Sequence, residues 1–397
     1  MLPKIAFFGT NALAAALIAE LQRLDFEIVG LWDQHLKTSS AWCAHFKIPV
    51  ASDSIEELLK DQEVDLVIVC ALPHFHREIT TKALAAGKHV ICEPPLGLTG
   101  SDNAAIMELA VYYPSMTLST FGMRHLPGVK AAKKALTDNL IGSIQAFEIS
   151  LHCGPSEIAE RMPYDSTCLR ELAAGPLFSA AIHLTDLMHH LAGQRVYTVC
   201  GTVKRFQKNP PQFKYDQHLT REDFIMWQGI LEGDIPCNTV INNNFPGKFE
   251  LRFTISGEKG SLVLDGDGGL FLETPGREQR DVIVSVDQSN SQSEAPLQRA
   301  PLQMGQRFDY RHPELVVKGV AAMCASLKEA FEPLPERRHW SAEQLTGAGT
   351  FRDCQYARAV VDAVKRSSET RRWTEVRIPT KALDGGSLSV SLARFTA

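Results

Sequence analysis

Short runs of almost continuous apolar residues mark the first quarter of the chain, and mixed stretches separate them. The runs cover residues 5–8, 26–32, 64–70 and 89–92. Such runs are typical of strands buried on both faces of a parallel sheet. Apolar residues recur at helical spacing over 75–86, and Gly87 then ends the predicted helix. The pattern therefore predicts strands that alternate with helices.

The later part of the chain shows a different pattern, in which apolar and polar positions alternate. Strands are predicted over 144–151, 195–206, 223–231, 238–244, 250–256 and 261–265. Their meander-like succession implies a largely antiparallel sheet. A helix over 172–186 separates the first two of these strands, and the Ser, Gln and Pro content of 288–305 predicts a mobile loop.

Composition narrows the class of protein. The 397 residues carry a formal net charge of -5, which argues against a nucleic-acid partner. No apolar run reaches the roughly 18 residues of a membrane span. The nine cysteines include no C-x-x-C pair, there is no N-x-S/T sequon, and cleavage of an apolar leader would remove the first strand. We therefore expect a cytoplasmic protein.

The turn after the first strand is a degenerate dinucleotide fingerprint. It reads Gly9-Thr10-Asn11-Ala12-Leu13-Ala14 and leads into an Ala/Leu-rich helix. Gly9 can make the tight turn and Ala14 allows close helix packing, but Asn11 replaces the glycine that lets a backbone approach a pyrophosphate. A strand-to-helix turn that begins with glycine is just as often a structural connection that binds no nucleotide. Asn tolerates positive φ better than most residues, which leaves cofactor binding open.

Asp33 ends the second strand, about 20 residues beyond this loop, where a ribose-binding acid is expected. An acid there favours NAD over NADP, because it would repel a 2'-phosphate. The alternative is that Asp33 caps the next helix.

The strand over 89–92 ends at Glu93-Pro94-Pro95, at the carboxyl edge of the sheet where open α/β folds place ligands. The helix over 172–186, with the residues that directly follow it, places His183, Asp186 and His190 on one helical face. Leu187 and mostly apolar neighbours accompany them, so we predict no metal site there.

These motifs, together with Pro73-His74-Phe75-His76 and the segment 86–93, resemble the superfamily of glucose-fructose oxidoreductase, inositol dehydrogenase and MocA. Within it, Val111-Tyr112-Tyr113-Pro114, Arg124-His125-Leu126-Pro127 and the segment 359–368 look like the glucose-fructose oxidoreductase domain-containing proteins. The resemblance covers almost the whole chain.

The resemblance implies a Rossmann domain, a doubly wound parallel sheet, over residues 1–124. It implies an α+β domain with a large, mostly antiparallel open sheet over 125–397, whose open face often forms a dimer interface. It also implies NAD(P) as cofactor and sugars or polyols as substrates. The cofactor-binding residues implied together by motif and resemblance are Gly9, Thr10, Asn11, Ala14, Asp33, Pro73, His74, His76, Glu93 and Pro94.

In the superfamily, a Glu-Lys-Pro loop supplies a lysine that handles the proton of the oxidised hydroxyl, with an aspartate and a histidine on the later helix. Here Pro94 stands at the lysine position, Ser179 stands at the aspartate position and only His183 is kept. By the same resemblance, the peptide preceding Pro95 is cis. His74 and His76 are placed beside this loop, although they could instead cap the following helix.

Two interpretations follow. The chain is either an NAD(P)-dependent oxidoreductase with impaired or altered catalysis, in which His183 is the candidate acid/base, or a non-catalytic binding or scaffolding protein that keeps the fold. Proline has no titratable group, and losing a positioned general base lowers a rate by typically 10²- to 10⁴-fold. We expect a dinucleotide partner, a polyhydroxylated small molecule as possible substrate, and a homo-oligomer, with neither nucleic acid nor membrane as partner.

Overall fold

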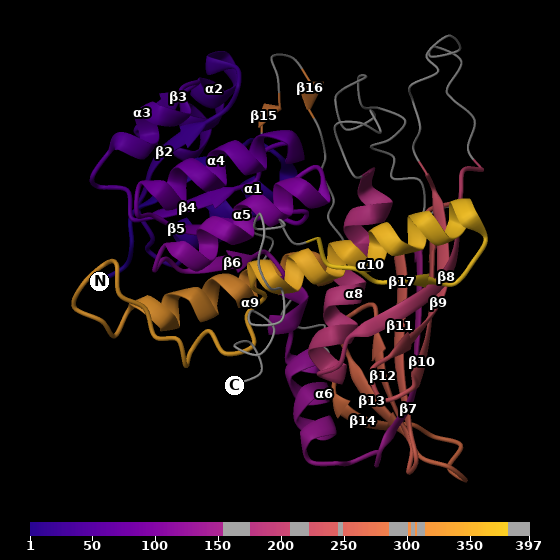
Figure 1. The fold of residues 1–397 in the computed structure, drawn as a ribbon. Helices are drawn as coiled ribbons and strands as arrows, with labels where there is room; N and C mark the ends of the chain where they lie inside the picture. The colour runs from indigo at the N-terminus through magenta and orange to yellow at the C-terminus, as the bar shows by residue number, and fades with distance from the viewer. Residues whose placement is uncertain are drawn as a thin grey trace.

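The computed structural model describes residues 1–153, 175–206, 222–244, 249–285, 301–302, 306–307 and 314–379. Two sheets organise these residues, one of six strands and one of nine (Figure 1). Within the described ranges, none of the helices combines the length and the apolar character that a membrane span requires.

The first sheet is parallel and its strand order is β3-β2-β1-β4-β5-β6. The order reverses between β1 and β4, which is the arrangement of a Rossmann fold. Its strands are β1 (Ile5–Phe8), β2 (Ile28–Trp32), β3 (Val50–Ser52), β4 (Leu66–Val69), β5 (His89–Cys92) and β6 (Thr117–Ser119). Its helices are α1 (Ala12–Arg23), α2 (Leu36–Phe46), α3 (Ile55–Lys60), α4 (Pro73–Ala85) and α5 (Gly100–Tyr112).

The sequence pattern predicts the centre of this sheet correctly. Every residue of β1, β2, β4 and β5 is buried, as the continuous apolar runs require. The helices between them cover the sheet, because their apolar stripes share two hydrophobic cores with its strands. The Rossmann architecture is therefore confirmed.

The second sheet has the order β14-β13-β12-β11-β7-β10-β9-β8-β17. The strands are β7 (Ile144–Cys153), β8 (Val196–Lys204), β9 (Phe224–Leu231), β10 (Ile235–Asn242), β11 (Phe249–Gly257), β12 (Ser261–Asp265), β13 (Leu270–Glu273), β14 (Asp281–Val284) and β17 (Thr374–Glu375). Its pairs are antiparallel except β7 with β10. The expected, mostly antiparallel sheet is confirmed, although β10 begins three residues before the predicted strand over 238–244.

One face of this sheet carries helices. Ile225 and Trp227 of β9 are buried while Met226 between them is exposed, so the strand has one covered and one open face. The helices of this part are η1 (Gly122–His125), α6 (Pro127–Thr137), α8 (Gly175–Ala192), α9 (Glu314–Phe331) and α10 (Phe351–Thr370). Figure 1 shows α6, α8 and α10 beside the sheet, with α10 reaching back toward the Rossmann fold.

Two predictions fall partly outside the described residues. The helix expected over 172–186 is described from Gly175 and continues to Ala192. Of the expected loop over 288–305, the structure describes only Pro301–Leu302, which forms β15 and pairs with β16 (Gln306–Arg307).

The helix α9 returns to the Rossmann fold across a long sequence separation. Its residues Val320, Leu327 and Phe331 share a hydrophobic core with α1. Near its start, Gly319 meets Gly122 so closely that a Cβ on Gly319 would lie 2.9 Å from the Gly122 carbonyl carbon. Glycine at both positions therefore lets two backbones touch.

A buried ion pair joins η1 to α8. The Arg124 Nε donates to Asp186 at 2.8 Å and its second terminal nitrogen donates to the other oxygen at 2.5 Å. The same guanidinium lies 3.4 Å from Asp353, which closes the capping box at the start of α10. Asp186, which the sequence placed on the face of His183, is thus part of this ion-pair network.

Candidate functional site

The tight turn after β1 requires glycine. Gly9 has φ +115°, and a Cβ there would lie 2.2 Å from the carbonyl oxygen of Cys70, at the end of β4. The turn delivers the chain directly into α1, whose residue Ala14 is fully buried. The fingerprint positions Gly9 and Ala14 therefore have the structural roles that the sequence predicts.

Asn11 at the second fingerprint position makes two side-chain contacts. Its Oδ1 accepts a hydrogen bond of 2.8 Å from the backbone N–H of Ala14, so Asn11 is the N-cap of α1. Its Nδ2 donates to Glu93 Oε2 at 2.6 Å. The position that usually carries glycine is thus filled by a carboxamide that connects the turn after β1 with the end of β5.

Asp33 lies immediately after β2 and faces the same turn. One carboxylate oxygen accepts a hydrogen bond of 2.6 Å from Thr10 Oγ1, and the other accepts from the backbone N–H of His35 at 3.0 Å. The N-cap of α2 is His35, and it has no side-chain cap bond. Asp33 therefore does not cap the helix through the usual N2 or N3 contact, and Thr10 orients its carboxylate toward the loop.

The Glu93-Pro94-Pro95 turn follows β5 and lies next to the end of β4. Glu93 is half-buried, and burial raises the pKa of its carboxyl to about 7, whereas the hydrogen bond from Asn11 lowers it. Pro94 and Pro95 are both buried, and the peptide bond between them is cis, as the resemblance implies.

His76 links this turn to the start of α4. Its Nδ1 lies 2.8 Å from the Pro95 carbonyl oxygen and its Nε2 lies 2.7 Å from that of Ala71. Burial lowers the pKa of His76, and the bonds to the two carbonyls raise it. Because carbonyl oxygens only accept, a neutral ring can donate to only one of them at a time.

The alternative that these histidines cap the next helix is wrong. The N-cap of α4 is Leu72, which makes no side-chain cap bond, and Pro73 is the first residue of the helix. His74 packs its ring on Phe75 at 4.0 Å between centroids, and burial lowers its pKa. His76 therefore lies beside the proline turn, as the resemblance implies.

Arg358 of α10 holds the segment that follows the proline turn, and the sequence did not identify it. Its guanidinium donates to the carbonyl oxygens of Gly97 at 3.3 Å and Leu98 at 3.0 Å, and its Nε donates to Asp362 at 2.9 Å. An arginine among apolar neighbours, as in Ala357-Arg358-Ala359, signals a buried cation. That signal identifies no partner, because the partners here are backbone atoms about 260 residues earlier.

His183 lies on α8 and is half-buried. Its ring meets Phe121 edge to face at 5.3 Å between centroids, and burial lowers its pKa to about 4. Among the described residues His183 has no hydrogen-bond partner, and Ser179, one turn earlier, is half-buried as well. The ring is therefore neutral near pH 7 and is a weak base.

The hydrogen bonds thus divide the predicted residues into groups. They join Thr10 with Asp33, Asn11 with Glu93, and His76 with Pro95, all at the carboxyl edge of the parallel sheet. His183 contacts Phe121 at the start of η1 instead. Among the described side chains, no cluster of three or more His, Cys, Asp or Glu residues could hold a metal ion.

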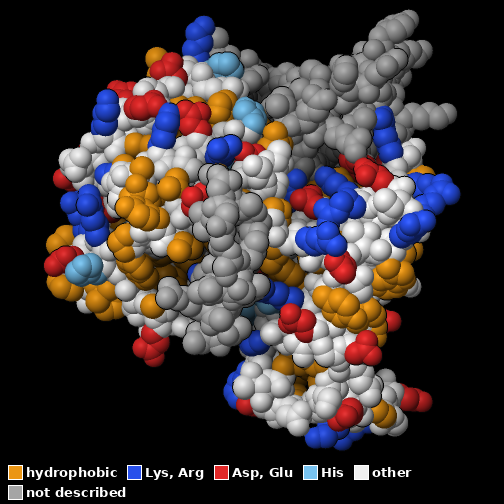
Figure 2. All heavy atoms as spheres, in the orientation of Figure 1, with side chains coloured by type: hydrophobic (Ala, Val, Ile, Leu, Met, Phe, Trp, Pro, Cys, Tyr) orange, Lys and Arg blue, Asp and Glu red, His pale blue; other side chains and the backbone are white. Residues whose placement is uncertain are grey.

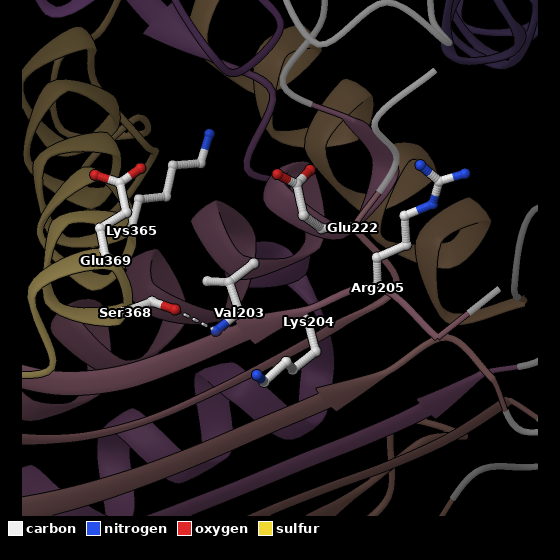
Figure 3. Close-up of a pocket in the computed structure, with 7 residues that line it drawn as sticks. All are labelled: Val203, Lys204, Arg205, Glu222, Lys365, Ser368 and Glu369. Atoms are coloured by element: carbon white, nitrogen blue, oxygen red, sulfur yellow. Dashed lines mark hydrogen bonds between the residues drawn. The ribbon is translucent and has the colours of Figure 1, made fainter. Parts of the chain in front are cut away.

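A pocket of about 280 Å³ lies elsewhere, between the end of β8 and α10 (Figure 3). Its lining residues are Val203, Lys204, Arg205, Glu222, Lys365, Ser368 and Glu369, and none of them is a predicted site residue. Figure 2 shows Lys and Arg side chains interspersed with acidic ones on the face that carries α10. We place the candidate site at the carboxyl ends of β1, β4 and β5, because hydrogen bonds join the turn after β1 to the acid after β2 and to Glu93 after β5 there.

Both halves of the chain match models of one protein family. Residues 3–118 match the oxidoreductase family with an NAD-binding Rossmann fold, and residues 129–263 match the GFO/IDH/MocA C-terminal domain. The chain therefore belongs to the GFO/IDH/MocA oxidoreductase family. It is 30% identical to glucose-fructose oxidoreductase domain-containing protein 1 of Mus musculus, over 96% of this chain and 94% of that relative.

Solved structures share the whole fold. Levoglucosan dehydrogenase in complex with NADH and levoglucosan aligns with a TM-score of 0.76 at 17% identity, over 95% of this chain and 100% of that one. The super-repressor mutant of Gal80p from Saccharomyces cerevisiae aligns with a TM-score of 0.71 at 18% identity, over 95% and 98% of the two chains. Identities this low show the fold and not the activity.

The raised pKa of Glu93 predicts a pH-dependent stability. Between 4.5, its ordinary value, and about 7, the folded protein keeps a proton that the unfolded chain releases. The bound proton contributes fully to the stability of the folded protein below pH 4.5, and this contribution is lost as the pH rises through about 7. The loss in the free energy of unfolding is roughly 1.4 kcal/mol per unit of pKa difference. The side chain of Glu93→Gln is neutral at every pH. This variant should therefore have a higher melting temperature than the unmodified protein near pH 8, and the difference in melting temperature should be smaller near pH 5.

Thermal melts followed by circular dichroism across this pH range test the prediction. Glu329→Gln, which removes an exposed carboxylate of α9, is the matched control and should show no such trend. If the melting-temperature difference between Glu93→Gln and the unmodified protein is the same at every pH, the pKa of Glu93 is not raised.

Proposed function

We propose that the chain binds a nicotinamide dinucleotide, with NAD favoured over NADP, across the crevice between β1 and β4. The observation that carries this proposal is the pair formed by the Gly9 turn and Asp33, which Thr10 holds against that turn. Phosphate groups bind at helix N-termini that follow such glycine turns, and the acid after β2 binds the ribose. A 2'-phosphate would meet the Asp33 carboxylate, which disfavours NADP.

The residues present fit this group in most respects. A side chain at Gly9 would overlap the Cys70 carbonyl, so the turn is as tight as the fingerprint requires. Gly9, Thr10, Asn11 and Ala14 would line the phosphates, and Asp33 the adenosine ribose. Pro73, His74, His76, Glu93 and Pro94 would line the nicotinamide side. A bound dinucleotide would supply the hydride acceptor or donor.

Oxidation of a hydroxyl group also requires that a residue of the chain accepts its proton. The chain departs from the family pattern in this proton transfer. Pro94 cannot accept one, Ser179 has no charge to polarise a base, and the pKa of His183 is lowered to about 4. We infer an oxidoreductase for a sugar- or polyol-like substrate whose catalysis is impaired or altered. His183 is its candidate acid/base.

A second candidate function is a non-catalytic pseudoenzyme that acts as a binding or scaffolding protein. Pro94 at the lysine position favours it, because a proline cannot be converted to a base by any change of environment. The shared fold is compatible with both functions, since one structural neighbour is a levoglucosan dehydrogenase and another is a super-repressor mutant of Gal80p. The two functions differ in turnover and not in dinucleotide binding.

We also propose a homo-oligomer that forms through the open face of the second sheet. Met226 is exposed there and pairs across strands with Val240, which makes an apolar pair on the face opposite the buried Ile225 and Trp227. The described cysteines are all free thiols, which suits the reducing cytoplasm that we propose as its compartment. Light scattering that finds only monomers at micromolar concentration would remove the oligomer proposal.

Dinucleotide binding predicts a rise in melting temperature that grows with ligand concentration. Asp33→Ala should weaken NAD binding by about tenfold, because it removes a charge-assisted bond to the ribose, and should weaken NADP binding less. Asp138→Ala, which removes an exposed acid at the C-cap of α6, is the control. If neither dinucleotide shifts the melting temperature up to millimolar concentration, and mass spectrometry of the native protein finds none bound, the proposed function is wrong.

Impaired proton transfer predicts that standard dehydrogenase activity on a polyol panel is absent or very slow. Pro94→Lys alone would lack a carboxylate partner, and Ser179→Asp alone would lack a lysine to orient. The increase in turnover rate of the double variant should therefore exceed the product of the increases of the two single variants. A gain of about 10²-fold in rate is expected if a general base is restored.

Pro94→Met combined with Ser179→Asn is the matched control, since it changes shape without adding a titratable group. Robust turnover by the unmodified protein that His183→Ala abolishes would instead make His183 the working base and remove the pseudoenzyme interpretation.

A further inference from the structure

The hydrogen bond between Asn11 and Glu93 crosses the mouth of the proposed dinucleotide crevice. Asn11 follows β1 and Glu93 follows β5, and β4 lies between these two strands in the sheet. The 2.6 Å bond therefore spans the carboxyl end of β4, beside the point where the strand order reverses. Ligands of open α/β sheets bind at that point.

The same contact changes the start of α1. The Asn11 carboxamide holds the N–H of Ala14, one of the donors that a helix N-terminus offers to a phosphate. The bond to Asn11 also brings the Glu93 carboxylate next to the first turn of α1. An anion bound there would meet a side chain over part of the helix end and, above a pH of about 7 where the Glu93 carboxyl ionises, a second negative charge beside it.

We propose that Asn11 and Glu93 form a latch that lowers the affinity of the chain for its dinucleotide and opens when the pyrophosphate binds. The inference rests on the proposed dinucleotide function and deepens it. Asn11 is then the residue that sets cofactor affinity, in contrast to the glycine of the family fingerprint, which leaves the helix end uncovered. The latch connects the phosphate turn to the proline turn, so opening it also frees the Glu93 side chain on the nicotinamide side.

The test is the binding of NADH to purified full-length variants at pH 8, where the Glu93 carboxyl is ionised, followed by the fluorescence of the reduced nicotinamide. Asn11→Gly removes the latch and is compatible with folding, since glycine is tolerated at N-caps. It should bind NADH at least about tenfold more tightly, because a hydrogen bond to a charged group no longer has to break. Asn139→Gly makes the same substitution at an exposed turn residue with positive φ after α6 and should leave the affinity unchanged.

A double-mutant cycle identifies the partner. Glu93→Gln keeps the shape and removes the charge, so it should also tighten binding. The double variant should gain clearly less than the product of the two single gains, since both substitutions weaken one contact.

The outcomes separate the latch from the function on which it rests. Tighter binding by Asn11→Gly together with a non-additive cycle supports the latch. If the unmodified protein binds NADH and Asn11→Gly binds it equally or more weakly, or if the two gains multiply, the latch is overturned and the dinucleotide function stands. If neither the unmodified protein nor any variant binds NADH, both are overturned.

Discussion

The buried ion pair between Arg124 and Asp186 is the contact on which the arrangement of the two sheets depends. Arg124 follows the last strand of the Rossmann sheet, Asp186 lies in the middle of α8, and Asp353 at the start of α10 completes the group. Removing one partner of such a pair leaves an unpaired charge in the protein interior, which lowers the free energy of unfolding by about 3–5 kcal/mol. Because α8 carries His183 and α10 carries Arg358, this one guanidinium connects the helices of both residues to η1.

The sequence predicted those parts of the site that lie within one strand–turn–helix unit. Gly9, Ala14 and Asp33 have fixed spacings along the chain, and each spacing follows from the geometry of one such unit. The buried strands were predictable for the same reason, because a strand covered on both faces must be apolar throughout. The cis bond before Pro95 was expected from family resemblance and not from spacing.

Contacts between distant segments could not be predicted in this way. The bond from Asn11 to Glu93 depends on the positions of three strands, and the bonds from Arg358 reach backbone carbonyls, which every residue type has. The parallel pairing of β7 with β10 depends on which edge of β7 was open, a property of the whole sheet. His76 shows a third case: its place between a strand end and a helix allowed a cap, but its two carbonyl neighbours show that it links the proline turn to the end of β4.

The backbone contact between Gly122 and Gly319 has a consequence for how the chain can be divided. It brings α9 so close to η1 that Leu327 and Phe331 complete the core beneath α1. A fragment that ends near residue 124 would keep every strand of the parallel sheet and yet expose to water the apolar surface that α9 covers. The core of the Rossmann fold is therefore complete only after the ribosome has synthesised α9. Its folding then depends on a segment that lies about 200 residues beyond its last strand.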